Sequence, residues 1–141
     1  MRLRLSVVTT LLLAAVPVLA HHGSAGFDQN KPVHFTGKIS SVDWSNPHVV
    51  IHIDVAGVNG QVTTWLVNTL PPNVAKRNGY PESSFSAGTE LTIDGFQATD
   101  GSKHVNGTNI LFPDGRKIVS PDCFDNHGPG CYKPVDLTRV R

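Results

Sequence analysis

The chain has 141 residues and a formal net charge of +1, with 12 basic and 11 acidic side chains. No basic run is longer than two residues, as in Lys76-Arg77. Binding to phosphate backbones requires concentrated positive charge, so the composition excludes a nucleic acid partner.

The first 20 residues have the pattern of a signal peptide. Arg2 and Arg4 form a basic start, an apolar run follows over residues 5–19, and Ala20 is a small residue where a signal peptidase would cut. At about 15 residues the run is short for a membrane span, which needs about 20. A retained anchor is the alternative. We expect cleavage after Ala20, export to the periplasm, and no stable membrane insertion of the processed protein.

The pattern beyond the leader predicts an arm at residues 21–31, a β domain at residues 32–118 and a tail at residues 119–141. Apolar and polar residues alternate between His48 and Val55, which predicts a strand whose buried face consists of Val49, Ile51, Ile53 and Val55. Further strands are predicted at residues 32–44, 61–68, 90–98, 105–112 and 117–118.

Local signals connect these strands. The apolar residues in the early and late parts of the first strand alternate in different phase. A bulge near Ser40-Ser41 would bring both sets to the same face and would bend the strand. Asn59-Gly60 predicts a two-residue hairpin turn, and residues 73–78 predict a short helix that ends at Gly79. This order predicts an all-β domain with one short helix, built as a small five-stranded OB-like barrel. An open sandwich of the same strands is the alternative.

Several motifs resemble a family of short secreted bacterial proteins known as a domain of unknown function. The motifs are Ala20-His21-His22, Phe27-Asp28, Lys31-Pro32-Val33, Gly37-Lys38-Ile39, Trp44-Ser45-Asn46-Pro47-His48, Pro72-Asn73 and Pro113-Asp114-Gly115-Arg116-Lys117. The resemblance covers residues 1–118 and implies a Gram-negative periplasmic protein, without an activity. The tail that contains Cys123 and Cys131 departs from the usual family ending.

A histidine at a processed N-terminus can bind one metal ion through both its α-amine and its own Nδ1. The α-amine has a pKa near 8, so the free base is accessible at neutral pH. Nitrogen ligands of this kind favour Cu(II). The arrangement at His21 is similar to the histidine brace of secreted copper monooxygenases and some periplasmic copper carriers, which needs one further imidazole. In a competing geometry the α-amine, the next backbone nitrogen and the imidazole of His22 bind the ion.

His48 is the predicted further imidazole, because it follows a turn at a strand end that the arm could reach. His52 lies four residues along the same strand, about 13 Å away, so the two cannot share an ion. His34 is a weaker reserve, and His104 and His127 are expected to be solvent-exposed in loops.

A metal-free binding module is the second hypothesis. OB-like barrels bind ligands through their second and third strands and the adjoining loops. Here that face would offer Trp44, Asn46, His52 and Trp65 to a small ligand or to an envelope protein, although both tryptophans also fit a role at the rim of the core. No nucleophile, phosphate loop or haem motif is recognisable, which favours a binding protein over an enzyme.

Cys123 and Cys131 are the only cysteines, and export would bring them to an oxidising compartment. We predict that they form a disulfide. Mass measurement of exported protein before and after reduction should then show a gain of about two hydrogens, and the short loop should contribute about 3 kcal/mol or less to stability. Two thiols that react with an alkylating reagent before reduction would exclude the bond.

Overall fold

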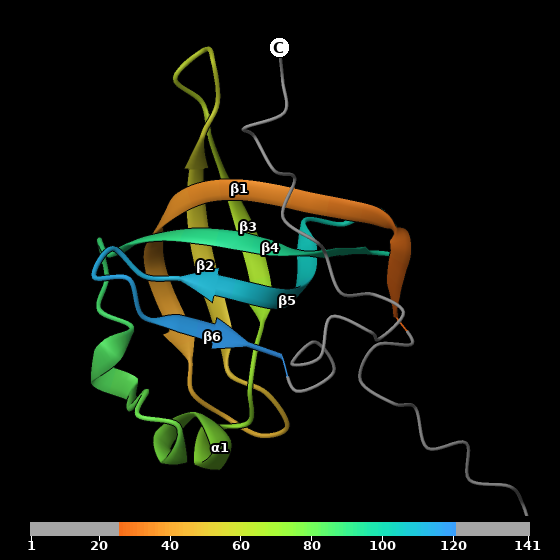
Figure 1. Cartoon of the computed structure of the whole chain (residues 1–141). Coiled ribbons are helices and arrows are strands. Elements are labelled where there is room, and N and C mark those ends of the chain that lie inside the picture. Colours follow the sequence, from red (N-terminus) through yellow and green to blue (C-terminus); the bar gives the residue numbers. More distant parts are fainter. Residues whose placement is uncertain (1–25, 121–141) are drawn as a thin grey trace, which may run out of the picture.

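The computed structural model describes residues 26–120 and is shown in Figure 1. The elements in chain order are β1 (Phe27–Asp43), β2 (Val50–Ala56), β3 (Val62–Asn68), α1 (Pro72–Arg77), the 3-10 turn η1 (Glu82–Ser84), β4 (Glu90–Ala98), β5 (His104–Leu111) and β6 (Lys117–Val119). The prediction of an all-β domain with one short α-helix is confirmed. Across residues 26–120, no helix has the length and apolar character needed to cross a membrane.

Five of the strands pair around a closed ring. β1 pairs antiparallel with β2 and β4, β2 with β3, and β4 with β5. A short parallel pairing of β3 with β5 joins Leu66–Asn68 to His104–Asn106 and closes the ring. β6 pairs with the later part of β5. This order agrees with the predicted five-stranded OB-like architecture, to which β6 adds a sixth strand.

β1 is the longest strand, with 17 residues, and it curves so far that it pairs with two neighbours (Figure 1). The predicted bulge is present, because the register with β2 shifts between Ile39 and Ser41. β1 begins at Phe27 rather than at Pro32, so the last part of the predicted arm is strand. Phe27 pairs with Ala98, a contact that the polar sequence of residues 28–31 does not indicate.

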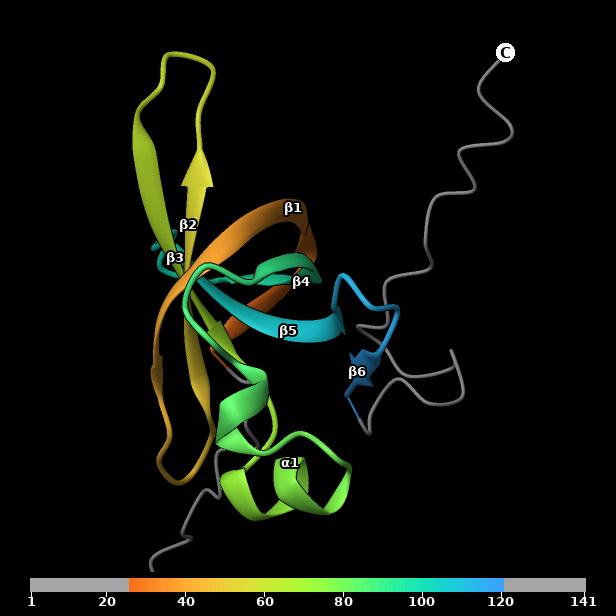
Figure 2. The same ribbon diagram turned by 90° about the vertical axis from the view of Figure 1, so that its left-hand side faces the viewer.

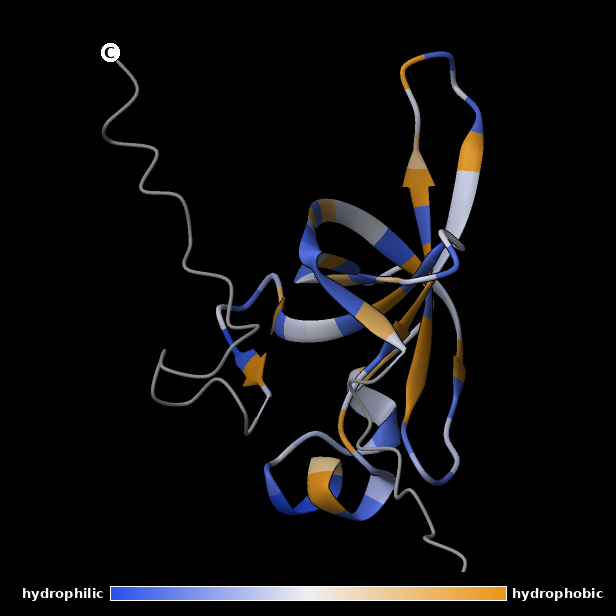
Figure 3. Ribbon diagram, turned by 90° about the vertical axis from the view of Figure 1, so that its right-hand side faces the viewer, coloured by the Kyte–Doolittle hydropathy of each residue, from blue (hydrophilic) through white to orange (hydrophobic). Residues whose placement is uncertain are grey.

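The core lies inside the ring and follows the predicted strand faces. Val49, Ile51 and Ile53 are fully buried, as expected from the alternation, and Val55 is half-buried against the core. Figure 3 shows hydrophobic and hydrophilic residues alternating along the strands. Other buried residues come from every side of the ring, namely Ile39, Val67, Leu70, Ala75, Phe85, Leu91, Ile93, Val105, Ile110, Phe112 and Ile118.

α1 has simple local reasons for its bounds. Pro72 opens it, where a fixed φ suits the first turn and a missing N–H costs nothing. It ends before Gly79, whose φ of +85° is the left-handed conformation predicted for that glycine. Ala75 is the buried residue of α1 and packs with the core.

The buried face of β2 can be tested with one substitution. Ile51→Ala should lower the free energy of unfolding by about 2–5 kcal/mol, because Ile51 is fully buried and its truncation leaves a cavity. The measurement is the denaturant midpoint of both proteins. Val50→Ala is the matched control, since Val50 is only half-buried. A larger loss in the control than in Ile51→Ala would contradict the assignment of the faces.

Candidate functional site

His48 lies between the β1–β2 turn and β2, and it is half-buried. Its Nδ1 lies 3.1 Å from the carbonyl oxygen of Thr69. A carbonyl only accepts, so in the neutral ring Nδ1–H donates and Nε2 keeps its lone pair. A backbone carbonyl that holds one ring nitrogen is the usual support of a metal-binding histidine. The orientation of His48 is therefore compatible with its predicted role, with Nε2 as the ligand atom.

The backbone around this hydrogen bond is fixed on both sides. Thr69 N–H donates to Val49 O over 3.0 Å, and Val49 N–H donates to Leu70 O over 3.0 Å. These bonds continue the β2–β3 ladder past its last paired residues. The carbonyl that accepts from His48 is thus held by the sheet and not by a free loop.

His52 has a different partner. Its Nε2 lies 2.9 Å from Oδ2 of Asp43, on the outer face of β1 and β2. The Asp43 side chain is 64% exposed, so this is a surface pair of small energetic value. The spacing along β2 still puts His52 about 13 Å from His48. The structure gives His52 a carboxylate partner of its own.

The residues predicted to bind a ligand do not share one aromatic cluster. The Trp44 ring lies 5.8 Å from Phe85, whereas the Trp65 ring lies 5.0 Å from Phe35. Both tryptophans are half-buried against the core. Asn46 is exposed in the turn after β1. The packing favours the alternative role of the two tryptophans, at the rim of the core.

His104 was expected to be solvent-exposed in a loop, and that expectation is wrong. It is the first residue of β5 and is half-buried, with Nε2 2.7 Å from Oδ1 of Asn68. The Phe27 ring meets it edge-on at 5.3 Å. Burial lowers the pKa of His104 below its ordinary value of 6.5, and the carboxylate of Asp100 opposes part of that shift. With Nε2–H donating to Asn68, Nδ1 keeps a lone pair.

Sequence reasoning missed His104 because the predicted strand began one residue too late. The alternation of β5 could have included His104, because His104 and Asn106 lie on the same face of the strand and Val105 between them is buried. Its contacts come from distant parts of the chain, which no local pattern reveals.

A continuous series of contacts runs from the start of β1 to His48. Phe27 touches His104, and His104 bonds to Asn68. Asn68 is followed by Thr69, whose carbonyl accepts from His48. The two half-buried imidazoles, each held through one nitrogen, therefore have their partners on consecutive residues: Asn68 at the end of β3 holds His104, and Thr69 directly after it holds His48.

His21 and His22 lie outside the described residues, as do Cys123 and Cys131. Between residues 26 and 120, no group of three or more His, Cys, Asp or Glu residues is placed to hold a metal ion. Phe27 lies six positions after His21, and an extended segment of that length spans about 20 Å. A metal site at His48 or His104 would need ligands from outside residues 26–120.

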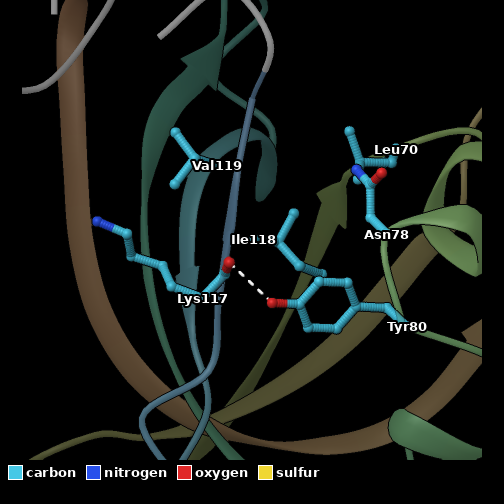
Figure 4. A pocket seen from close by; sticks show the side chains of 6 residues that line it. All are labelled: Leu70, Asn78, Tyr80, Lys117, Ile118 and Val119. Atoms are coloured by element: carbon cyan, nitrogen blue, oxygen red, sulfur yellow. Dashed lines mark hydrogen bonds between the residues drawn. The ribbon is translucent and has the colours of Figure 1, made fainter. Parts of the chain in front are cut away.

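A cavity of about 330 Å³ opens beside β6, as Figure 4 shows. Tyr80 lies across it and donates its hydroxyl to Lys117 O over 2.8 Å. No imidazole or carboxylate lines it, since its walls are Leu70, Asn78, Tyr80, Lys117, Ile118 and Val119. Near this wall the buried Oγ1 of Thr69, the residue before Leu70, has no hydrogen-bond partner within the described part of the chain. The cavity is distinct from the predicted ligand-binding face.

Residues 9–108 match the model of a family described as a family of unknown function (DUF6152). The chain belongs to this family. The resemblance to an uncharacterised family is thereby confirmed, and the matched region of this DUF6152 protein includes His21, His22, His48 and His104. No curated protein and no solved structure matches the chain.

The lowered pKa of His104 predicts a pH dependence of stability. The neutral ring is favoured in the folded state, so its contribution is complete above the unfolded pKa of about 6.5 and is lost as pH falls through the folded pKa. The urea midpoint should therefore fall more between about pH 7 and about pH 5 in the unmodified protein than in His104→Gln. Equal decreases of the urea midpoint in the two proteins would show that His104 does not cause the pH dependence of stability.

Proposed function

We propose that this protein is a periplasmic binding protein that holds Cu(II) at its processed N-terminus. Cleavage after Ala20 would free the α-amine of His21, which binds together with its own Nδ1. Nε2 of His48 is the third nitrogen, and His22 supplies the ligand in the competing geometry. Nitrogen-only ligation of this kind suits Cu(II) above the other divalent ions of the first transition row.

One observation carries this proposal: Phe27, at the start of β1, contacts His104, and the partners of His104 and His48 are the consecutive residues Asn68 and Thr69. It supports a path by which the segment before β1 reaches an oriented imidazole. The span from His21 to Phe27 is at most about 20 Å, which sets the reach of the amine. The contact of Phe27 with His104 is what connects the start of β1 to a histidine of the domain.

His104 is the other imidazole within this region. Its Nδ1 carries the open lone pair, and burial keeps the ring neutral near pH 7, so few protons compete with a metal ion there. It is also in direct contact with Phe27. His48 is the preferred third ligand because a carbonyl held by the sheet fixes the tautomer of its imidazole. Substitutions of His48 and of His104 distinguish the two candidate ligands.

The exported location rests on the leader and on the family resemblance. The basic start, the apolar run and Ala20 form the leader pattern. The mature His-His start, followed by the Trp44-Ser45-Asn46-Pro47-His48 segment, supports a Gram-negative periplasmic protein. Copper chemistry is compatible with that compartment, and processing itself would create the ligand.

The metal-free binding module stays the second candidate because of the cavity beside β6. Its walls combine apolar side chains with one ammonium group, one amide and no acid. Such a lining suits a small neutral or anionic ligand. An envelope protein is the other partner compatible with this reading.

The copper proposal predicts that affinity depends on processing and not only on histidine content. Protein purified from the periplasm, with its N-terminus sequenced, is compared with protein that has one extra residue before His21. The extension keeps every imidazole but moves the α-amine out of the chelate. Cu(II) affinity should fall at least about tenfold in a competition titration against a chelator of known affinity. Equal affinities would exclude the amine and leave the metal-free module.

Single substitutions then identify the third nitrogen. His48→Ala should weaken binding in the processed protein, and His104→Ala does so if that ring is the ligand instead. His52→Ala is the matched control and should leave affinity unchanged, because its Nε2 pairs with Asp43. Binding should also weaken as pH falls through the range of imidazole and amine pKa values, since protons compete for each nitrogen.

A further inference from the structure

The β2–β3 hairpin projects well clear of the ring, as Figure 2 shows. Residues 55–64, which form it, include no charged side chain. Val58 at its tip is fully exposed, and Val62 at the start of β3 is 62% exposed. An uncharged projection with exposed apolar side chains is a feature that interaction surfaces share.

The backbone of β3 is unpaired along part of one edge. β3 pairs with β2 from Val62 to Asn68, but with β5 only from Leu66 onward. Leu66 N–H donates to Lys103 O over 2.8 Å and so points away from β2. Alternate residues of a strand direct their backbone groups to the same side. The N–H and C=O groups of Val62 and Thr64 therefore point outward too, and they have no backbone partner among residues 26–120.

We propose that this open edge is a self-association site that pairs antiparallel with the β3 edge of a second copy. The two-fold axis passes beside Thr63. Val62 of each copy then lies opposite Thr64 of the other, and each such pair exchanges two N–H to C=O hydrogen bonds. The two copies of Thr63 face each other as the non-hydrogen-bonded pair, because their own backbone groups bond to β2.

A second copy fits this edge for three reasons. The edge is self-complementary, as an isologous two-fold contact requires. Monomeric proteins protect exposed edges with lysine, proline or a bulge. Residues 55–64 contain no lysine or proline, and β3 pairs with β2 without a register shift. The hairpin stands away from the ring (Figure 2), so two hairpins can meet while the rings stay apart. The contact is small, which makes it a weak association that depends on concentration.

Sedimentation equilibrium of the full processed chain tests the association. The mass should rise toward that of a dimer as concentration increases from about 10 μM to about 1 mM, the range where small interfaces form. Val62→Lys should abolish the rise, because it places two like charges beside the axis. Val58→Lys is the matched control, since it adds the same charge to the same hairpin away from the paired edge, and it should still associate. A constant monomer mass at about 1 mM overturns the proposal.

Cross-linking tests the register, in a chain that also contains Cys123→Ser and Cys131→Ser. Thr63→Cys should form a disulfide-linked dimer under mild oxidation, because facing residues of a non-hydrogen-bonded pair have Cα atoms about 4.5 Å apart, within disulfide range. Thr64→Cys should react far more slowly, since it faces Val62 of the other copy. Equal rates in both variants, or loss of association in Val58→Lys alone, would mean contact through the apolar tip and would overturn edge pairing.

Discussion

The pairing of one strand with two neighbours is the constraint on which this structure depends. β1 pairs with β4 through its first part and with β2 through its second part. That requires a sharp change of direction, which the bulge between Ile39 and Ser41 and the close approach at Gly37 allow together. A Cβ atom on Gly37 would lie 2.6 Å from the carbonyl oxygen of Asp54, so no other residue fits without a shift of β2. The bend is therefore built into the sequence at two adjacent points of β1, and the ring can close only because of it.

Closure then creates the candidate site. The parallel pairing of β3 and β5 is short, yet it sets His104 beside Leu66 and brings its ring to Asn68. The bend of β1 also brings the Phe27 side chain against the imidazole of His104. His48 joins the arrangement through the carbonyl of the next residue after Asn68. Phe27, His48, Asn68 and His104 lie far apart in sequence, so local opening of the β3–β5 pairing would separate His104 from Asn68 while leaving most of the fold intact.

The part of the fold that local signals determine is also the part that could be predicted. The alternation in β2, a hairpin that turns at Asn59-Gly60 and the bounds of β4 each depend on neighbouring residues, and each is observed. The predicted turn length of two residues is wrong, because Gly57 N–H donates to Gln61 O over 2.7 Å and leaves three residues in the loop. The start of β1 could not be predicted, because residues 28–31 are polar and the strand reaches back to Phe27 only through the distant pairing of Phe27 with Ala98, across an irregular register. The same holds for the site. The role of His48 could be inferred from its place after a turn, but the carbonyl that orients it and the burial of His104 come from contacts between distant segments.

The two ends of β3 have different environments, and a single turn explains both. β5 begins where the β4–β5 turn ends, and that turn is tight: Gly101 N–H donates to Ala98 O over 3.0 Å, and Gly101 has a φ of +78° that favours glycine. β5 therefore cannot extend backward along β3 past Leu66. The half of β3 beyond that point keeps its outward backbone groups unpaired, whereas the half before α1 is paired on both sides and holds the histidine contacts. A longer β5 in the same register would cover the open edge and would leave His104 opposite Leu66. The open edge of β3 thus follows from where the β4–β5 turn ends, whereas the position of His104 follows from the register of the β3–β5 pairing.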